Sequence, residues 1–258
     1  MDRIGKCFKE LRRQKKMAFM PFVVAGDPDY KTSLKIVREL VKNADFLELG
    51  FPYSDPLADG PVIQRADMRA LASGMNSDRV FRLISKIRVF SDIPITVLAY
   101  ANLVYRRGVD KFYRDAGRAG IDAVLVPDLP VEESDKFVKA AKKYGIDSIF
   151  LVAQTTTKAR MKKILKQASG YLYLVSILGV TGIRKDIAPE TLGLIRQLKK
   201  LSKLPVVVGF GVSNARQIKI LRKAKADGVI VGSAIVKVIE KYKRNPSRAI
   251  KEFIKGLN

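Results

Sequence analysis

Three carboxylates lie in one proline-rich stretch of the sequence, ELGFPYSDPLADGP, which covers residues 48–61. Glu48 sits within an apolar run, and Asp55 and Asp59 follow in a segment that three prolines stiffen. A carboxyl group that is withdrawn from water has a raised pKa and can exchange protons near neutral pH, as general acid–base catalysis requires. Residue types alone also allow Glu48 to be a structural partner of Lys or Arg, and they favour turn or helix-capping roles for Asp55 and Asp59.

Histidine is absent from the 258 residues, and this absence narrows the chemistry. It excludes a Ser-His-Asp triad and most zinc sites, so no metal centre is expected. Proton transfer would fall to Asp, Glu, Tyr, Lys or the single cysteine, Cys7. One cysteine allows no internal disulfide, which agrees with a cytoplasmic protein.

The net charge of +24 comes from 49 Lys and Arg against 25 Asp and Glu. The cations are spread over nearly every helix-like segment, and no zinc-finger or RNA-recognition motif accompanies them. We therefore interpret them as a solvated surface that attracts anionic substrates, and we expect no nucleic-acid partner. A nucleic-acid or anionic-surface binder stays as the alternative, and binding that survives high salt would support it. No apolar run is long enough for a membrane span, so no membrane association is expected.

Short apolar runs alternate with longer amphipathic segments along the whole chain. The runs are continuously apolar, as is typical of parallel strands covered on both faces. The expected strands are residues 18–26, 46–50, 94–100, 123–128, 148–153, 171–176, 205–211 and 228–233. The segments between them carry apolar residues at spacings of three and four, which predicts helices.

This alternation predicts a (β/α)₈ barrel of the TIM type, formed by a single domain over residues 1–258. Residues 1–16 predict an extra helix before the first strand. The second possibility is a doubly wound open sheet, but the sequence VVAGDPDY after the first expected strand lacks the glycine pattern G-x-G-x-x-G.

Function in such a barrel lies at the carboxyl ends of the strands, and several of these ends carry glycine. The sequence GVTG follows the sixth expected strand, and GFG and GS end the seventh and the eighth. Backbone N–H groups there can approach a phosphate, although tight turns would also explain the glycines. Residue chemistry alone thus predicts a barrel enzyme for a phosphorylated small molecule, with carboxylates and either Tyr100 or Tyr173 at its site.

The sequence LELGFPYSDPLADGPVIQRA closely resembles the signature of the tryptophan synthase α subunit family. The resemblance continues in order through MPFVVAGDP, AYANLVYRRG, VPDLPVEES, SILGVTGIR, VGFGVS and VGSAIVKVIE, and so covers all eight units. It implies aldol cleavage of indole-3-glycerol phosphate to indole and glyceraldehyde 3-phosphate, without a cofactor in this subunit. The alternative is another phosphate-binding barrel enzyme of tryptophan or histidine biosynthesis, and the lack of lysine within the strand cores weakens it.

The resemblance also implies roles for individual residues. Glu48 would be the general acid and base, and Asp59 would contact the indole nitrogen. Further residues would bind the substrate: Phe22, Tyr100, Leu125, Tyr173, Thr181, Gly182, Phe210, Gly211, Val212, Gly232 and Ser233. The implied partner is a pyridoxal-phosphate β subunit in an α₂β₂ complex, with Asp55, Asn102 and Pro130 expected near that interface.

Overall fold

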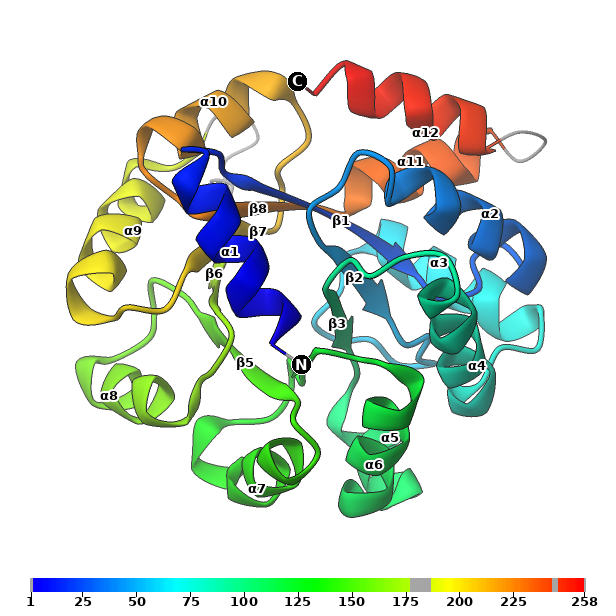
Figure 1. The fold of residues 1–258 in the computed structure, drawn as a ribbon, viewed down its shortest axis with the longest axis horizontal. Coiled ribbons are helices and arrows are strands. Elements are labelled where there is room, and N and C mark those ends of the chain that lie inside the picture. Colours follow the sequence, from blue (N-terminus) through cyan, green and yellow to red (C-terminus); the bar gives the residue numbers. More distant parts are fainter. Residues whose placement is uncertain (1, 177–186, 243–245, 258) are drawn as a thin grey trace.

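Parallel strands close into a barrel in the computed structural model, which describes residues 2–176, 187–242 and 246–257 (Figure 1). The barrel follows the chain order from β1 to β8, and β8 pairs with β1. The strands are β1 Ala18–Val24, β2 Leu47–Gly50, β3 Ile95–Leu98, β4 Ala123–Leu125, β5 Asp147–Val152, β6 Leu172–Val175, β7 Val206–Gly209 and β8 Gly228–Val231. The predicted (β/α)₈ barrel is therefore confirmed.

Helices form the outer layer around the barrel (Figure 1). Between and after the strands they are α2 Tyr30–Leu40, α3 Pro61–Ala72, α4 Ser77–Arg88, α5 Ala101–Arg107, α6 Val109–Ala119, the 3₁₀ helix η1 Val131–Glu133, α7 Asp135–Lys143, α8 Lys158–Gln167, α9 Pro189–Leu201, α10 Ala215–Lys223, α11 Ser233–Lys241 and α12 Pro246–Lys255. Among the described residues, no helix is both long and apolar enough to cross a bilayer.

Most strands end earlier than the apolar pattern predicts. The first was expected to continue to residue 26 and the third to residue 100, but β1 ends at Val24 and β3 ends at Leu98. The residues that follow are still buried: Ala25 is 0% and Tyr100 is 3% exposed. Because these residues are as buried as the strands before them, composition alone does not separate them from the strands.

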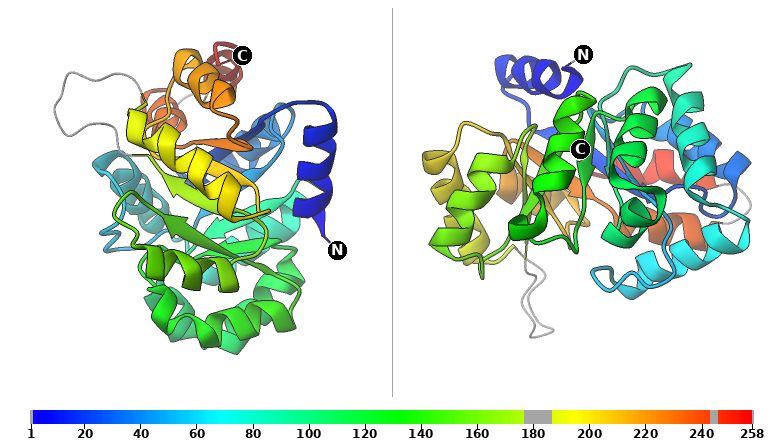
Figure 2. Two further views of the ribbon diagram at one scale, coloured as in Figure 1. Left: turned by 90° about the vertical axis from the view of Figure 1, so that its left-hand side faces the viewer. Right: turned by 90° about the horizontal axis from the view of Figure 1, so that it is seen from below.

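The predicted N-terminal helix is confirmed as α1, Arg3–Arg13, and it lies across one end of the barrel (Figure 2). Phe8 of α1 packs against Phe46, with ring centroids 4.7 Å apart, and against Tyr171 at 6.1 Å. Phe46 precedes β2 and Tyr171 precedes β6, so α1 covers the amino-terminal ends of the strands. The carboxyl ends lie at the opposite end of the barrel and are left for a functional site.

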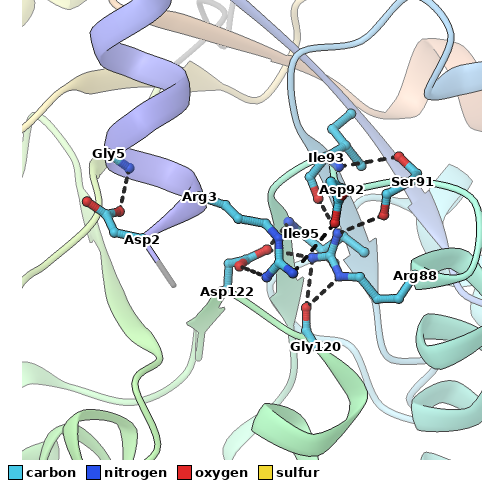
Figure 3. A network of polar contacts seen from close by, with 10 residues as sticks. All are labelled: Asp2, Arg3, Gly5, Arg88, Ser91, Asp92, Ile93, Ile95, Gly120 and Asp122. Carbon is cyan, nitrogen blue, oxygen red and sulfur yellow. Dashed lines mark hydrogen bonds and ion pairs between the residues drawn. The ribbon is translucent and has the colours of Figure 1, made fainter.

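A polar network joins strands at the same end as α1 (Figure 3). The buried Asp122 carboxylate accepts hydrogen bonds from Arg3 at 3.0 Å, from Arg88 at 2.6 Å and from the backbone N–H of Ile95 at 2.8 Å. Arg88 also donates to the carbonyl oxygen of Gly120 at 2.7 Å. These contacts tie α1, α4 and the starts of β3 and β4 together, away from the carboxyl ends of the strands.

Candidate active site

Glu48 lies inside the barrel. Its strand, β2, pairs with β1 and β3 so that Glu48 is in register with Phe22 and Thr96, and register partners in a parallel sheet point to the same face. The side chain is 0% exposed, and neither carboxylate oxygen has a hydrogen-bond partner within the described residues. Burial, assisted by the negative charge of Asp59, raises the pKa of Glu48 to about 8. A carboxyl group in this state is protonated at neutral pH and able to donate its proton.

Asp59 lies in the β2–α3 loop, residues 51–60, and is held by a residue from the connection between β3 and α5. The hydroxyl of Tyr100 donates to Asp59 Oδ2 at 2.7 Å and accepts from the backbone N–H of Ala58 at 3.1 Å. Burial raises the pKa of Asp59, and the Tyr100 hydrogen bond opposes that effect. One phenol therefore fixes both the loop backbone and the carboxylate, which contradicts a simple turn-capping role for Asp59.

The ring of Tyr53 stacks on the ring of Tyr100, with centroids 4.8 Å apart and planes 22° from parallel. The hydroxyl of Tyr53 accepts a hydrogen bond from the Asn102 side chain at 3.3 Å. The loop thus meets the β3–α5 connection through two aromatic rings, and this contact supports Tyr100 in the position from which it reaches Asp59.

A pocket opens at the carboxyl ends of the strands, with about 390 Å³ of empty space including its open mouth. The lining residues are Phe22, Asp59, Ile63, Leu98, Tyr173, Phe210, Gly211, Ile230, Gly232 and Ser233. The pocket is therefore apolar on most sides, with the Asp59 carboxylate on one wall and glycine-rich backbone on another.

Phe22 and Tyr173 connect this pocket to Glu48. Phe22 lines the pocket and is in register with Glu48, and the negative charge of Glu48 adds to burial in raising the pKa of Tyr173. Tyr173 packs edge-on against Phe210, with centroids 5.9 Å apart. Glu48 is thus buried next to the inner part of the pocket, while Asp59 lies at its wall.

The glycine-rich wall combines an unusual backbone with a helix start. Phe210 and Gly211 have φ angles of 67° and 76°, in the left-handed region that favours glycine. The hydroxyl of Ser176 donates to the carbonyl oxygen of Phe210 at 2.5 Å. Ser233 begins α11, so the first N–H groups of that helix face this part of the molecule without intrahelical partners. Such a helix start favours a phosphate group.

Two of the strand-end glycines make room for aromatic side chains. A Cβ atom at residue 209 would overlap the Tyr173 phenol, and one at residue 232 would lie 3.2 Å from the Phe22 ring. Neither an approaching phosphate nor a tight turn is needed to explain glycine at position 209. Its absent side chain lets Tyr173 lie across β7 at the pocket.

The family model for the tryptophan synthase alpha chain matches residues 8–257. This chain belongs to the tryptophan synthase alpha chain family. The resemblance of the strand-end motifs to that family is therefore confirmed, and the match favours the main interpretation over another phosphate-binding barrel enzyme.

Curated relatives of the family match almost end to end. The tryptophan synthase alpha chain of Methanoregula boonei is 51% identical over 94% of this chain and 92% of its own length. The tryptophan synthase alpha chain of Methanothermobacter thermautotrophicus is 54% identical over 88% of this chain and 85% of its own length. Such coverage leaves no large part of the barrel outside the family alignment.

Solved structures of the family share the fold. Tryptophan synthase subunit alpha from Legionella pneumophila has a TM-score of 0.90 and 36% identity, covering 100% of this chain and 97% of that chain. A chain from the tryptophan synthase α₂β₂ complex of Pyrococcus furiosus has a TM-score of 0.89 and 38% identity. The match covers 93% of this chain and 97% of that chain.

Most of the predicted site residues meet at the pocket. Phe22, Asp59, Tyr173, Phe210, Gly211, Gly232 and Ser233 line it. Tyr100 reaches it through Asp59, whereas Leu125 and Val212 are buried and do not belong to its lining. Thr181 and Gly182 lie outside the described residues.

Three residues were predicted at the partner interface: Asp55, Asn102 and Pro130. All three are exposed, and they lie on loops or helix starts at the carboxyl ends of the strands.

Three lining residues were not predicted: Ile63, Leu98 and Ile230. Side chains alternate along a strand, so Leu98 has the same facing as Tyr100 and Ile230 the same as Gly232, which were both predicted. This alternation of side chains along a strand was the sequence signal that could have predicted Leu98 and Ile230. Ile63 belongs to α3, where no comparable sequence signal existed.

Among the described residues, no group of three or more Asp, Glu or Cys side chains could hold a metal ion.

Proposed function

We propose that this chain cleaves indole-3-glycerol phosphate by a retro-aldol reaction, releasing indole and glyceraldehyde 3-phosphate, and thus acts as a lyase in tryptophan biosynthesis. The observation that carries this proposal is the fully buried, unpartnered carboxyl of Glu48 next to a pocket that Asp59 lines. Membership of the tryptophan synthase alpha chain family supports the choice of substrate.

Glu48 handles both proton transfers in this proposal. Its protonated carboxyl donates to C3 of the indole ring, which gives a cationic indolenine. The bond between C3 and the side chain then breaks, and its electron pair returns to the ring and restores indole. The adjacent hydroxyl becomes the aldehyde and gives its proton to the Glu48 carboxylate, so the enzyme returns to its starting state. A pKa of about 8 suits a group that must be an acid first and a base second.

Asp59 stabilises the charge that develops on the ring. Its carboxylate accepts a hydrogen bond from the indole N–H, and this bond strengthens as the indolenine becomes cationic. The 2.7 Å hydrogen bond from Tyr100 holds the carboxylate in one orientation and favours its ionised form. The carboxylate therefore needs no reorganisation during the reaction.

The remaining predicted residues bind the two ends of the substrate. Phe22, Tyr173 and Phe210 contact the indole and glycerol portions, together with the apolar side chains of Leu98 and Ile230. The phosphate lies against the backbone of Gly211, Gly232 and Ser233 at the start of α11. Thr181 and Gly182, expected from the resemblance to bind the substrate as well, lie outside the described residues. Leu125 and Val212 are buried outside the lining of this pocket.

The chain needs no cofactor of its own for this reaction, because every step is a proton transfer or a bond cleavage in the substrate. Its partner is a tryptophan synthase β subunit that carries pyridoxal phosphate and receives the indole, in an α₂β₂ complex like that of P. furiosus. Asp55, Asn102 and Pro130 are exposed at the right end of the barrel for that contact. We place the protein in the cytoplasm, and nucleic acid and membranes are not among its partners.

Incubation of the purified chain with indole-3-glycerol phosphate, without pyridoxal phosphate and with a metal chelator, tests the proposal. We expect indole and glyceraldehyde 3-phosphate to appear in equal amounts. Addition of a β subunit should raise the rate and bring the two proteins together in size-exclusion chromatography. No indole release, alone or with the β subunit, would contradict the proposed reaction, and failure to associate at micromolar concentration would contradict the proposed partner.

A further inference from the structure

Ser176 directly follows β6 and has no role in the mechanism above, but it holds the backbone at the end of β7. The residue is 4% exposed and does not belong to the pocket lining. Its hydroxyl donates a hydrogen bond of 2.5 Å to the carbonyl oxygen of Phe210. Its backbone N–H donates to the carbonyl oxygen of Gly209 at 3.0 Å. Ser176 therefore contacts two consecutive carbonyl groups where β7 runs into the pocket wall.

The peptide between Phe210 and Gly211 has an unusual conformation. Phe210 has a φ angle of 67°, which is rare for a bulky residue and persists only where neighbouring contacts hold it. Gly211 has a φ angle of 76°, but glycine adopts positive and negative φ about equally readily. The preferences of these two residues therefore do not fix the orientation of the peptide. The hydrogen bond from Ser176 does so, because it holds the carbonyl oxygen.

The same hydrogen bond sets the direction of the Gly211 N–H. This peptide is trans, so its carbonyl and its N–H point to opposite sides. The carbonyl points to Ser176, outside the pocket lining, whereas Gly211 is part of that lining. The N–H is thus directed away from Ser176 and to the side of the pocket. It has no backbone acceptor among the described residues.

An anion is the ligand that suits this N–H. Gly211 lines the same pocket as Gly232 and Ser233, where α11 begins with N–H groups that lack intrahelical partners. A backbone N–H that points at a phosphate forms a charge-assisted hydrogen bond, whereas a carbonyl oxygen in its place would repel the phosphate. The orientation of this one peptide therefore decides whether the wall attracts a phosphate or repels it.

We propose that Ser176 is a positioning residue, whose hydroxyl holds the Phe210–Gly211 peptide so that the Gly211 N–H binds the phosphate of the substrate. The proposal rests on the proposed function for the identity of that substrate. It deepens that function by giving a role to a side chain outside the pocket.

The effect of Ser176 is confined to the phosphate end of the substrate. Rotation of the peptide moves its N–H and its carbonyl but leaves the Cα atoms on either side in place. The Phe210 ring packs against Tyr173, with centroids 5.9 Å apart, and so keeps its position in the apolar part of the pocket. Loss of the Ser176 hydroxyl should therefore weaken phosphate binding without disturbing proton transfer.

Two substitutions of Ser176 isolate its hydroxyl. Ser176→Ala removes the hydroxyl and leaves the rest of the side chain. Ser176→Thr keeps a hydroxyl that can donate to the Phe210 carbonyl. Ser85→Ala is the matched control, because Ser85 is exposed on α4 and does not line the pocket.

Calorimetric titration gives the dissociation constants of glycerol 3-phosphate, which carries a phosphate, and of indole, which does not. We expect Ser176→Ala to weaken binding of glycerol 3-phosphate about tenfold, as loss of one hydrogen bond to a charged group does, and to leave indole binding unchanged. The same variant should raise the KM for indole-3-glycerol phosphate by a similar factor, with little change in kcat. Ser176→Thr should restore most of the binding, and Ser85→Ala should match the unsubstituted protein.

The amide resonance of Gly211 in the unsubstituted protein gives a second measurement, which stands even if Ser176→Ala does not fold. Its proton should shift downfield as glycerol 3-phosphate is added. A Gly211 amide that does not respond would overturn the proposal.

Three results with the variants would also contradict it. These are an unchanged affinity of Ser176→Ala for glycerol 3-phosphate, an equal weakening of its indole binding, and a folded Ser176→Thr that binds glycerol 3-phosphate as weakly as Ser176→Ala. The titrations involve no turnover, whereas the proposed reaction fails only if no indole is released. Failure of this inference is thus distinguishable from failure of the proposed function.

Discussion

Glu48→Gln is expected to fold, to bind indole-3-glycerol phosphate and to release indole roughly 10²–10⁴-fold more slowly. Glutamine has almost the same shape as glutamic acid, but it can neither donate a proton to C3 of the indole nor accept one from the substrate hydroxyl. The site holds no histidine that could substitute, since the sequence contains none. KM should change little because Glu48 acts on the reacting atoms.

Steady-state indole release under saturating substrate measures this effect. Glu190→Gln is a matched control, because Glu190 is exposed in the first turn of α9 and should leave the rate unchanged. A Glu48→Gln protein that turns over at close to the normal rate would remove Glu48 from the mechanism.

Asp59→Asn should lower kcat about 10²–10³-fold, as the loss of one preorganised electrostatic contact to a transition state does. The amide can still occupy the same place beside Tyr100, but it carries no negative charge to stabilise the cationic indolenine. The pocket keeps its shape, so binding of the phosphate end should persist.

Single-turnover cleavage with the variant in excess over substrate separates the chemical step from substrate binding. The loss should appear in the cleavage rate, with a KM close to that of the unsubstituted protein. An unchanged rate of indole formation would return Asp59 to the role of a turn residue.

The barrel was predictable because its strands are continuously apolar and its helices have clear periodicity. The ends of the strands were not, since Ala25 and Tyr100 are as buried as the strand residues before them. An apolar sequence predicts that a segment is buried, but it does not show where the strand ends and the buried connection after it begins.

The candidate site was predictable where a motif or a strand end marked it, as for Glu48, Asp59 and Phe210. Ile63 was missed, although it shares the buried face of α3 with Ala66 and Ala70 at helical spacings. That spacing predicts a buried helix face, but it does not show that α3 brings Ile63 to the pocket. The stacking of Tyr53 on Tyr100 depends on a contact between the β2–α3 loop and the β3–α5 connection, and it could not be predicted from the sequence.

The raised pKa of Glu48 has a consequence for stability. The carboxyl ionises near its ordinary pKa of 4.5 in the unfolded chain, but only near pH 8 in the folded protein. Between these values the folded state binds more protons, so the free energy of unfolding falls as the pH rises from about 4.5 to about 8. Catalysis thus uses a group whose burial opposes folding at alkaline pH.

Direct titration of Glu48 tests the central claim, which is that burial keeps this carboxyl protonated at neutral pH. Infrared difference spectra between the unsubstituted protein and Glu48→Gln isolate the protonated carboxyl band of this one residue as the pH is varied. We predict that the band persists at pH 7 and disappears around pH 8. A band that is lost near pH 4.5, the ordinary range of a glutamic acid, would contradict the account.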